Sequence, residues 1–161
     1  MTIAIYPGSF DPISNGHLDI ATRAARLFEK VVIGVYDKPD KHIVFTTEER
    51  VELVRQAIAD LPNVEVEPFS GLAVDFAKKV GAQVMVRGLR MSADFEREFD
   101  MAMMNKKLYP EIEVVCLMAD LKYHFLSSSL LKEVASLGGD IKELVPKPVA
   151  EALRAKFLVT P

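Results

Sequence analysis

Short apolar segments alternate along this chain with longer segments of helical periodicity, and this alternation constrains the fold more than any other feature. The apolar segments have the length and composition of strands, and most are continuously apolar, which is typical of parallel strands covered on both faces. They lie at residues 2–6, 31–36, 64–66, 83–86 and 112–118. We therefore predict a doubly wound, Rossmann-like α/β domain over residues 1–161, with a five-stranded parallel sheet and helices on both faces.

The helical segments carry local signals at their ends. They are expected at about residues 16–29, 46–61, 72–80, 92–108, 128–137 and 149–157. Thr46 and Glu49 have the spacing of a capping box, and Gly81 is a typical residue just beyond a helix. In the fourth helix Phe95, Phe99, Ala102 and Met103 recur at i, i+4, i+7 and i+8. Four methionines are expected in the core or at a subunit interface rather than around a cofactor: Met101, Met103, Met104 and Met118.

Charge and cysteine content exclude several classes of function. The 161 residues carry a net charge of −3, which argues against partners recognised by overall charge, such as nucleic acid or a membrane surface. The lone cysteine, Cys116, forms no intramolecular disulfide, and no basic and apolar leader pattern precedes the first strand. We expect a cytoplasmic protein. Three well-separated histidines and one cysteine have no metal-ligand spacing, so no protein metal site is expected.

Candidate functional residues gather in the loops that follow the strands, where open α/β sheets bind their ligands. Gly16 and His17 open a helix, and a helix N-terminus is an anion site to which an imidazole adds a directed donor. Arg87 and Arg90 follow a buried strand, and guanidinium groups suit phosphate oxygens. The alternative for these arginines is salt bridges within the protein, with acidic partners close by in sequence: Asp94, Glu96 or Glu98.

A serine triplet, residues 127–129, precedes the next helical segment. These hydroxyls and the free N–H groups of the helix start suit the outer phosphates of a nucleotide, although one serine as a simple N-cap explains the triplet equally well. Three common motifs are missing from the sequence: the dinucleotide GxGxxG, the Walker A loop and the GxSxG elbow. A dehydrogenase, a P-loop enzyme and an α/β-hydrolase are therefore disfavoured.

These motifs together resemble a known family. Residues 6–12 (YPGSFDP) with 14–17 (SNGH) resemble the first signature of the nucleotidylyltransferase superfamily, and 87–90 (RGLR), 94–96 (DFE) and 125–134 (FLSSSLLKEV) narrow the resemblance to the phosphopantetheine adenylyltransferase family. The resemblance runs from end to end. It implies transfer of AMP from ATP to 4′-phosphopantetheine, Mg²⁺ bound with the ATP phosphates, and a homo-oligomer, typically a hexamer.

The resemblance also implies residue roles. His17 corresponds to the catalytic residue that stabilises the transition state. The positions matching ATP contacts are Ser9, Phe10, His17, Gly88, Leu89, Arg90, Glu98, Tyr123, His124, Phe125, Leu126, Ser127, Ser128 and Ser129. The positions matching contacts with the second substrate are Ser9, Lys41, Ala73 and Arg87.

Three positions depart from the family pattern. Ser14 stands where the superfamily often has histidine, Arg97 replaces a frequent tyrosine, and His124 replaces a frequent serine. Two other functions stay open on the sequence alone. One is a related nucleotidylyltransferase that acts on nicotinamide mononucleotide, or on a phospho-alcohol with CTP; the other is a nucleotide-sensing module without turnover.

Overall fold

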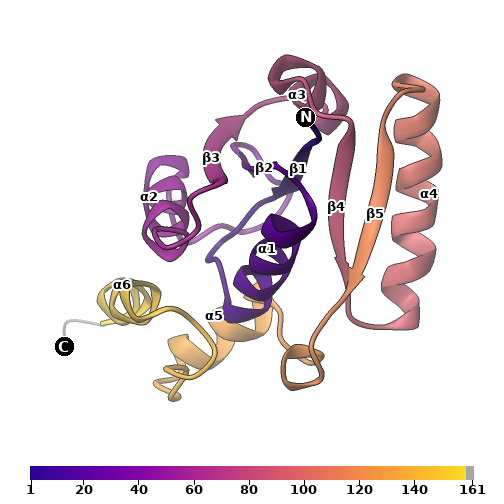
Figure 1. Ribbon diagram of the computed structural model, residues 1–161. Helices are drawn as coiled ribbons and strands as arrows, with labels where there is room; N and C mark the ends of the chain where they lie inside the picture. The colour runs from indigo at the N-terminus through magenta and orange to yellow at the C-terminus, as the bar shows by residue number, and fades with distance from the viewer. Residues whose placement is uncertain (159–161) are drawn as a thin grey trace.

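Five parallel strands form one sheet, in the order β3-β2-β1-β4-β5, in the computed structural model, which describes residues 1–158 (Figure 1). The strands are β1 (Ile3–Gly8), β2 (Lys30–Tyr36), β3 (Val64–Phe69), β4 (Val84–Leu89) and β5 (Glu113–Met118). The helices are α1 (Asn15–Leu27), α2 (Thr47–Ala57), α3 (Ala73–Val80), α4 (Ser92–Leu108), α5 (Ser128–Ser136) and α6 (Lys147–Phe157). The predicted five-stranded parallel α/β sheet is confirmed.

Helices cover both faces of the sheet because alternate residues of each buried strand point to opposite sides. Ala4 and Tyr6 pack into a cluster with residues of α1, α2, α5 and α6, whereas Ile5 between them packs with residues of α3 on the other face. Strand order reverses at β1, whose neighbours are β2 and β4. This switch point is where an open α/β sheet places its binding crevice.

Several boundaries differ from the predicted ones. β1 continues through Pro7 and Gly8, and β3 continues to Phe69, because each pairs with β2 along its whole length. β3 is an edge strand, which tolerates Pro68 and the alternating glutamates that hid it in the sequence. The capping box of Thr46 and Glu49 is confirmed. A short 3₁₀ turn, η1 (Leu121–Tyr123), has no counterpart in the prediction.

The apolar side of α4 does not pack in the core. Phe95, Phe99 and Met103 are more than half exposed, and Met101 and Met104 are exposed as well. The residue of α4 that is buried is Asn105, whose amide lies against the sulfur of Met85. Of the two expectations for these methionines, a place in the core is wrong for this chain, and a subunit interface remains.

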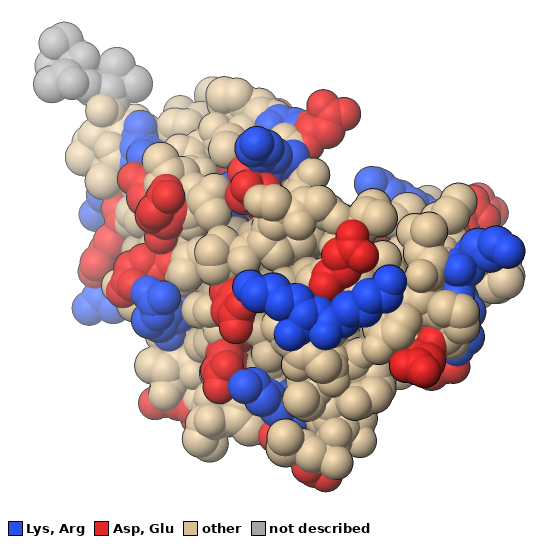
Figure 2. Space-filling model, turned by 90° about the horizontal axis from the view of Figure 1, so that it is seen from above, with Lys and Arg blue, Asp and Glu red and all other residues tan. Residues whose placement is uncertain are grey.

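Charges are dispersed over the surface. On the face seen in Figure 2, basic and acidic side chains are interspersed rather than separated into two regions. This agrees with the small net charge of the sequence. None of the helices within residues 1–158 has both the length and the apolar composition that crossing a bilayer requires.

Candidate active site

A pocket of about 620 Å³ opens at the carboxyl ends of β1 and β4, on the two sides of the switch point. Most of the predicted site residues line it: Ser9, Phe10, His17, Lys41, Arg87, Gly88, Arg90, Glu98, Tyr123, Leu126, Ser127, Ser128 and Ser129. They come from five separate segments of the chain. The convergence expected from the loop positions is therefore present in the fold.

Four predicted residues are not among those that line the pocket. Leu89 is buried in the core, and Ala73 begins α3 and packs on the opposite face of the sheet. The ring of His124 bonds through Nε2 to the carbonyl of Ala119 at 3.1 Å. Phe125 is 58% exposed. The contact expected of Ala73 is one through its backbone, and for all four positions the contact with a ligand stays a prediction.

The turn after β1 is held by a buried arginine. Arg50, on α2, is fully buried and donates to the carbonyls of Ser9 (2.8 Å), Tyr36 (2.7 Å) and Phe45 (3.2 Å). Burial lowers its pKa, yet an arginine stays charged at any ordinary pH. The next residue of the turn, Phe10, has φ of 47°, in the left-handed region that few side chains adopt. Arg50 therefore ties a strained turn to the ends of two other segments.

A buried carboxylate fixes the other side of the same turn. Asp11 is completely buried and accepts hydrogen bonds from the backbone N–H groups of Val44 (2.8 Å) and Phe45 (2.9 Å). Lys132, on α5, donates to Asp11 at 3.0 Å and to the carbonyl of His42. These bonds join the turn after β1, the segment before α2 and α5. Sequence reasoning missed Arg50 and Lys132, although Arg50 stands one turn before Val54 on the apolar face of its helix.

His17 is held by the residue that caps its own helix. The backbone N–H of Ser14 donates to Nδ1 of His17 at 3.0 Å, and Oγ of Ser14 accepts from the backbone N–H of His17 at 3.2 Å. Nδ1 accepts a hydrogen bond from this peptide N–H, so Nδ1 itself is unprotonated. The neutral ring therefore carries its proton on Nε2. Within residues 1–158, Nε2 makes no hydrogen bond. The ring thus offers one directed N–H donor to the pocket that it lines.

The environment of His17 keeps the ring neutral. Burial, together with the charges of Arg90, Lys41 and Arg87, lowers its pKa from the ordinary 6.5 to about 4. Phe10 packs against the ring edge, with centroids 5.0 Å apart. At neutral pH the imidazole is therefore a donor without a net charge.

Arg87 and Arg90 are both paired with carboxylates of α4, although Arg87 lies inside β4, which extends beyond its predicted end, and only Arg90 follows the strand. Arg87 donates to Glu98 through Nε (2.9 Å) and Nη2 (2.8 Å), and to the carbonyl of Pro7. Burial disfavours the charge of Arg87, but the hydrogen bonds and charge of Glu98 outweigh it and raise the pKa. Arg90 contacts Asp94 at 3.3 Å and the carbonyl of Leu126 at 2.7 Å. The salt-bridge alternative is thus realised, and both side chains also line the pocket.

The serine triplet provides the N-cap of α5 and also lies at the pocket, while its binding of phosphates stays a prediction. Ser127 is the N-cap of α5 and accepts from the backbone N–H of Leu130, and Ser128 donates to the carbonyl of Pro12 at 2.9 Å. All three serines line the pocket. Two helix N-termini, those of α1 and α5, therefore meet at its wall.

The described residues provide no ready metal site. Within residues 1–158, no group of three or more His, Cys, Asp or Glu side chains is placed to hold a metal ion. The two pocket carboxylates beside β4, Asp94 and Glu98, are engaged by arginines.

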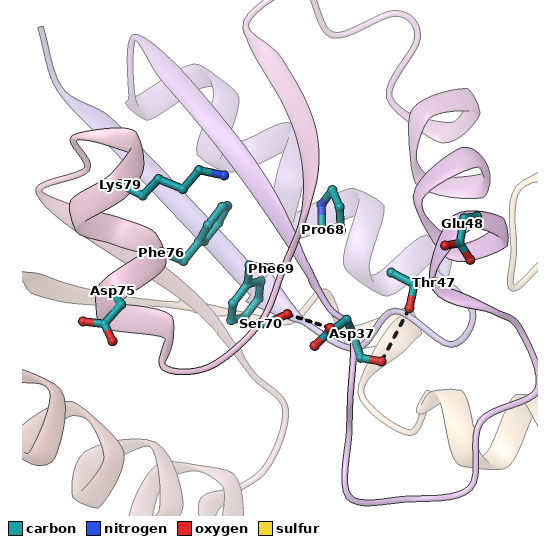
Figure 3. A pocket seen from close by; sticks show the side chains of 9 residues that line it. All are labelled: Asp37, Thr47, Glu48, Pro68, Phe69, Ser70, Asp75, Phe76 and Lys79. Atoms are coloured by element: carbon teal, nitrogen blue, oxygen red, sulfur yellow. Dashed lines mark hydrogen bonds between the residues drawn. The ribbon is translucent and has the colours of Figure 1, made fainter.

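A second pocket, of about 520 Å³, lies beside the edge strand β3 (Figure 3). Its charged residues are mostly acidic: Asp37, Glu48 and Asp75. Its lysine, Lys79, pairs with Glu67 at 3.4 Å. Asp37 accepts a hydrogen bond from Ser70, as the close view shows. This surplus of negative charge repels phosphates, so the pocket at β1 and β4 is the better candidate for an anionic ligand.

Known proteins resemble this chain in sequence and in structure. Residues 5–134 match the cytidylyltransferase-like family. A phosphopantetheine adenylyltransferase of Roseiflexus sp. (strain RS-1) is 54% identical, covering 98% of each chain. Another, from Thermomicrobium roseum, is 55% identical and covers 96% of this chain and 94% of the relative. A provisionally assigned nicotinate-nucleotide adenylyltransferase of Vibrio parahaemolyticus has the same fold, with a TM-score of 0.75 over 99% of this chain and 98% of its own, at 19% identity.

The long matches agree with the arrangement of the pocket, where two helix N-termini and several cations converge at the switch point. Their identities are well above 30%, and they extend over nearly the whole chain. The chain therefore belongs to the phosphopantetheine adenylyltransferase family, within the cytidylyltransferase-like family, and is a nucleotidyltransferase.

Proposed function

We propose that the pocket transfers AMP from ATP to 4′-phosphopantetheine, which yields dephospho-CoA and pyrophosphate. Relatives of more than half identity carry the corresponding name. The single observation that supports the chemistry best is the neutral His17, whose Nε2–H is unengaged in a pocket rich in arginine, lysine and helix N-termini. Such an arrangement stabilises charge that develops on a phosphoryl group.

The reaction needs no enzyme nucleophile. An oxygen of the acceptor phosphate forms a bond to the α-phosphorus of ATP, and the bond from that phosphorus to the bridging oxygen of pyrophosphate breaks in line. The acceptor is already an anion at neutral pH, so no strong general base is required. The barrier arises from bringing two anions together and from charge on the transferring group, which makes positioning and electrostatics the main sources of catalysis.

Each part of the pocket then has a role. Lys41 and Arg87 offset the repulsion around the acceptor phosphate, and His17 with the N-terminus of α1 stabilises the pentavalent phosphorus. Arg90 and the serines at the start of α5 hold the departing phosphates. Because Arg87 is already bonded to Glu98, a phosphate binds there by sharing the guanidinium rather than by taking an unpaired one.

ATP enters, in this proposal, as its Mg²⁺ complex. The described residues lack a metal cluster of their own, so the ion belongs to the substrate and is held by phosphate oxygens. It neutralises part of the charge on the pyrophosphate that leaves.

We further propose a cytoplasmic homo-oligomer, a hexamer by the resemblance. The exposed apolar side chains of α4, among them Phe95, Phe99 and Met103, support an interface there, since an apolar patch of this kind is unusual on a monomer. Multi-angle light scattering measures the mass directly. A monomer at micromolar concentration contradicts this part of the proposal.

The activity is tested by incubating the full chain with MgATP and 4′-phosphopantetheine. Pyrophosphate release and the mass of dephospho-CoA are measured together, beside a panel with nicotinamide mononucleotide as acceptor and with CTP plus a phospho-alcohol. Turnover restricted to 4′-phosphopantetheine is expected. Preference for another acceptor assigns a different nucleotidylyltransferase, and nucleotide binding without any product supports a sensing module instead. An adenylylated protein in the quenched reaction contradicts direct transfer.

A further inference from the structure

Arg97 lies on the side of α4 that faces the pocket. It follows Asp94 by three residues and precedes Met101 by four, so these side chains share one helix face. Asp94, Arg97 and Glu98 all line the pocket. The segment between β2 and α2 contributes Asp40 and Lys41 to the same lining. Arg97 and Lys41 thus belong to different elements that border the same cavity.

The charge of Arg97 is not neutralised by a partner. Within residues 1–158 its guanidinium makes no ion pair or hydrogen bond, whereas Arg87 is bonded to Glu98 and Arg90 to Asp94. These pairs engage both carboxylates of α4 that line the pocket, so neither is paired with Arg97. A cation beside a pocket gains most when a ligand supplies the missing negative charge.

The ammonium group of Lys41 also has no ion-pair partner among the described residues. Lys132, another nearby cation, is bonded to Asp11. Burial lowers the pKa of Lys41, and the charges of Lys132 and Arg97 lower it further. Asp40 adds one negative charge, so the pocket lining has four cations, Lys41, Arg87, Arg90 and Arg97, against three carboxylates. The surplus positive charge lies on the side chains without partners.

We propose that Arg97 binds a phosphate group of a substrate in the pocket that it lines together with Lys41, and so adds a second phosphate-binding cation to that of Lys41. This inference rests on the proposed function. Arg97 stands where the resembling family often has tyrosine, which carries no positive charge. A planar guanidinium forms two parallel hydrogen bonds with phosphate oxygens, which a phenol cannot do.

Isothermal titration of the full-length Arg97→Ala protein tests the assignment. The ligands are 4′-phosphopantetheine, pantetheine without its phosphate, and ATP. We expect the Kd for 4′-phosphopantetheine to rise roughly tenfold, because one charge-assisted hydrogen-bond pair is lost. The Kd for pantetheine is expected to be unchanged. Arg97→Lys should recover part of the affinity, and Arg97→Tyr should not.

A matched control separates a local contact from a general change in charge. Arg154 is an exposed arginine on α6 and does not line the pocket. Arg154→Ala should leave all three affinities unchanged. If Arg97→Ala weakens ATP binding alone, the phosphate bound is that of the nucleotide. If it weakens neither phosphorylated ligand, or weakens pantetheine equally, the proposal is overturned.

The binding experiment is independent of turnover. A wild-type chain that binds 4′-phosphopantetheine through Arg97 but forms no dephospho-CoA contradicts the proposed function and leaves this inference standing. Normal turnover by the wild type, together with unchanged affinities in Arg97→Ala, overturns this inference and leaves the proposed function standing.

Discussion

Ser14 and His17 hold one another across the first turn of α1. The backbone N–H of Ser14 donates to Nδ1 of His17, while the hydroxyl of Ser14 accepts from the backbone N–H of His17. The same contact thus caps the helix and selects the Nε2–H tautomer of the ring. A capping box normally uses Glu or Gln at this position; here the imidazole replaces them, and its other nitrogen is left for the pocket.

Replacing His17 by alanine removes the directed donor. We expect kcat to fall by about 10²–10³, the loss typical of one transition-state hydrogen bond, with KM for ATP changed little. Steady-state kinetics with both substrates measures the two effects separately. A rise in KM with an unchanged kcat makes His17 a binding residue only. Circular dichroism of the variant verifies that the fold is retained.

The variant Ser14→Ala tests which group of Ser14 sets the ring, because Oγ lies 3.2 Å from Nδ1 and also accepts from the backbone N–H of His17. It removes the hydroxyl that accepts from the helix but keeps the backbone N–H that donates to the ring. The free energy of unfolding should fall by about 1 kcal/mol, the usual cost of a lost N-cap, while kcat stays within a few-fold of the wild type. Denaturant unfolding and kinetics on the same sample measure both. A loss of kcat comparable to that of His17→Ala means that the hydroxyl, not the peptide N–H, sets the ring.

The partly buried imidazole of His17 makes the stability of the fold sensitive to acid. The pKa of His17 is about 4 in the folded chain, below its ordinary value of 6.5, so the unfolded chain takes up a proton first as the pH falls. The stabilisation is therefore complete above pH 6.5 and is lost progressively toward pH 4. A shift of this size amounts to roughly 3 kcal/mol, and solvent in the open pocket reduces it to about 2 kcal/mol.

The comparison that isolates this contribution is between the wild type and His17→Gln. The free energy of unfolding of the wild type should fall more steeply between pH 6.5 and 4, and the difference should be about 2 kcal/mol. His42→Gln, which removes an exposed imidazole outside the pocket, is the control. Equal slopes in the wild type and His17→Gln contradict the depressed pKa.

Lys41 forms no ion pair among the described residues, so its charge is available to the acceptor. Lys41→Ala should raise the Kd for 4′-phosphopantetheine by roughly tenfold and leave that for ATP nearly unchanged. Titration of each ligand alone gives both constants. An unchanged affinity for the acceptor removes Lys41 from its proposed role.

Much of the sheet was predictable because parallel strands that are buried on both faces consist of continuous apolar residues. The edge strand β3 was underestimated for the converse reason: Glu65 and Glu67 face outward and break the apolar pattern. Periodicity predicted the bounds of α4 correctly but not the environment of its apolar face, where Phe95 and Phe99 are left exposed by the described chain. A sequence pattern shows which residues lie on one side of a helix but not what covers that side.

Some residues of the pocket were predictable from the sequence and others were not. Residues at or beyond the carboxyl ends of strands, such as His17, Arg87 and Ser128, were found because strand ends converge at one edge of a parallel sheet. The choice of partner was not predictable: Arg87 had three carboxylates nearby in sequence, and helix geometry selects Glu98. Arg50 was missed because its partners are backbone carbonyls, which leave no mark in the sequence.

Arg50 does not line the pocket, but its replacement should disturb the turn that shapes the pocket. Arg50→Met keeps the length of the side chain but removes the donors to Ser9, Tyr36 and Phe45, leaving buried carbonyls without partners. We expect a loss of about 3 kcal/mol in the free energy of unfolding, together with weaker binding of both substrates as the turn after β1 loosens. Arg55→Met, on the same helix, removes an exposed pair with Glu52 and should cost less than about 0.5 kcal/mol. Urea unfolding of both variants measures the contrast, and equal losses contradict an anchoring role for Arg50.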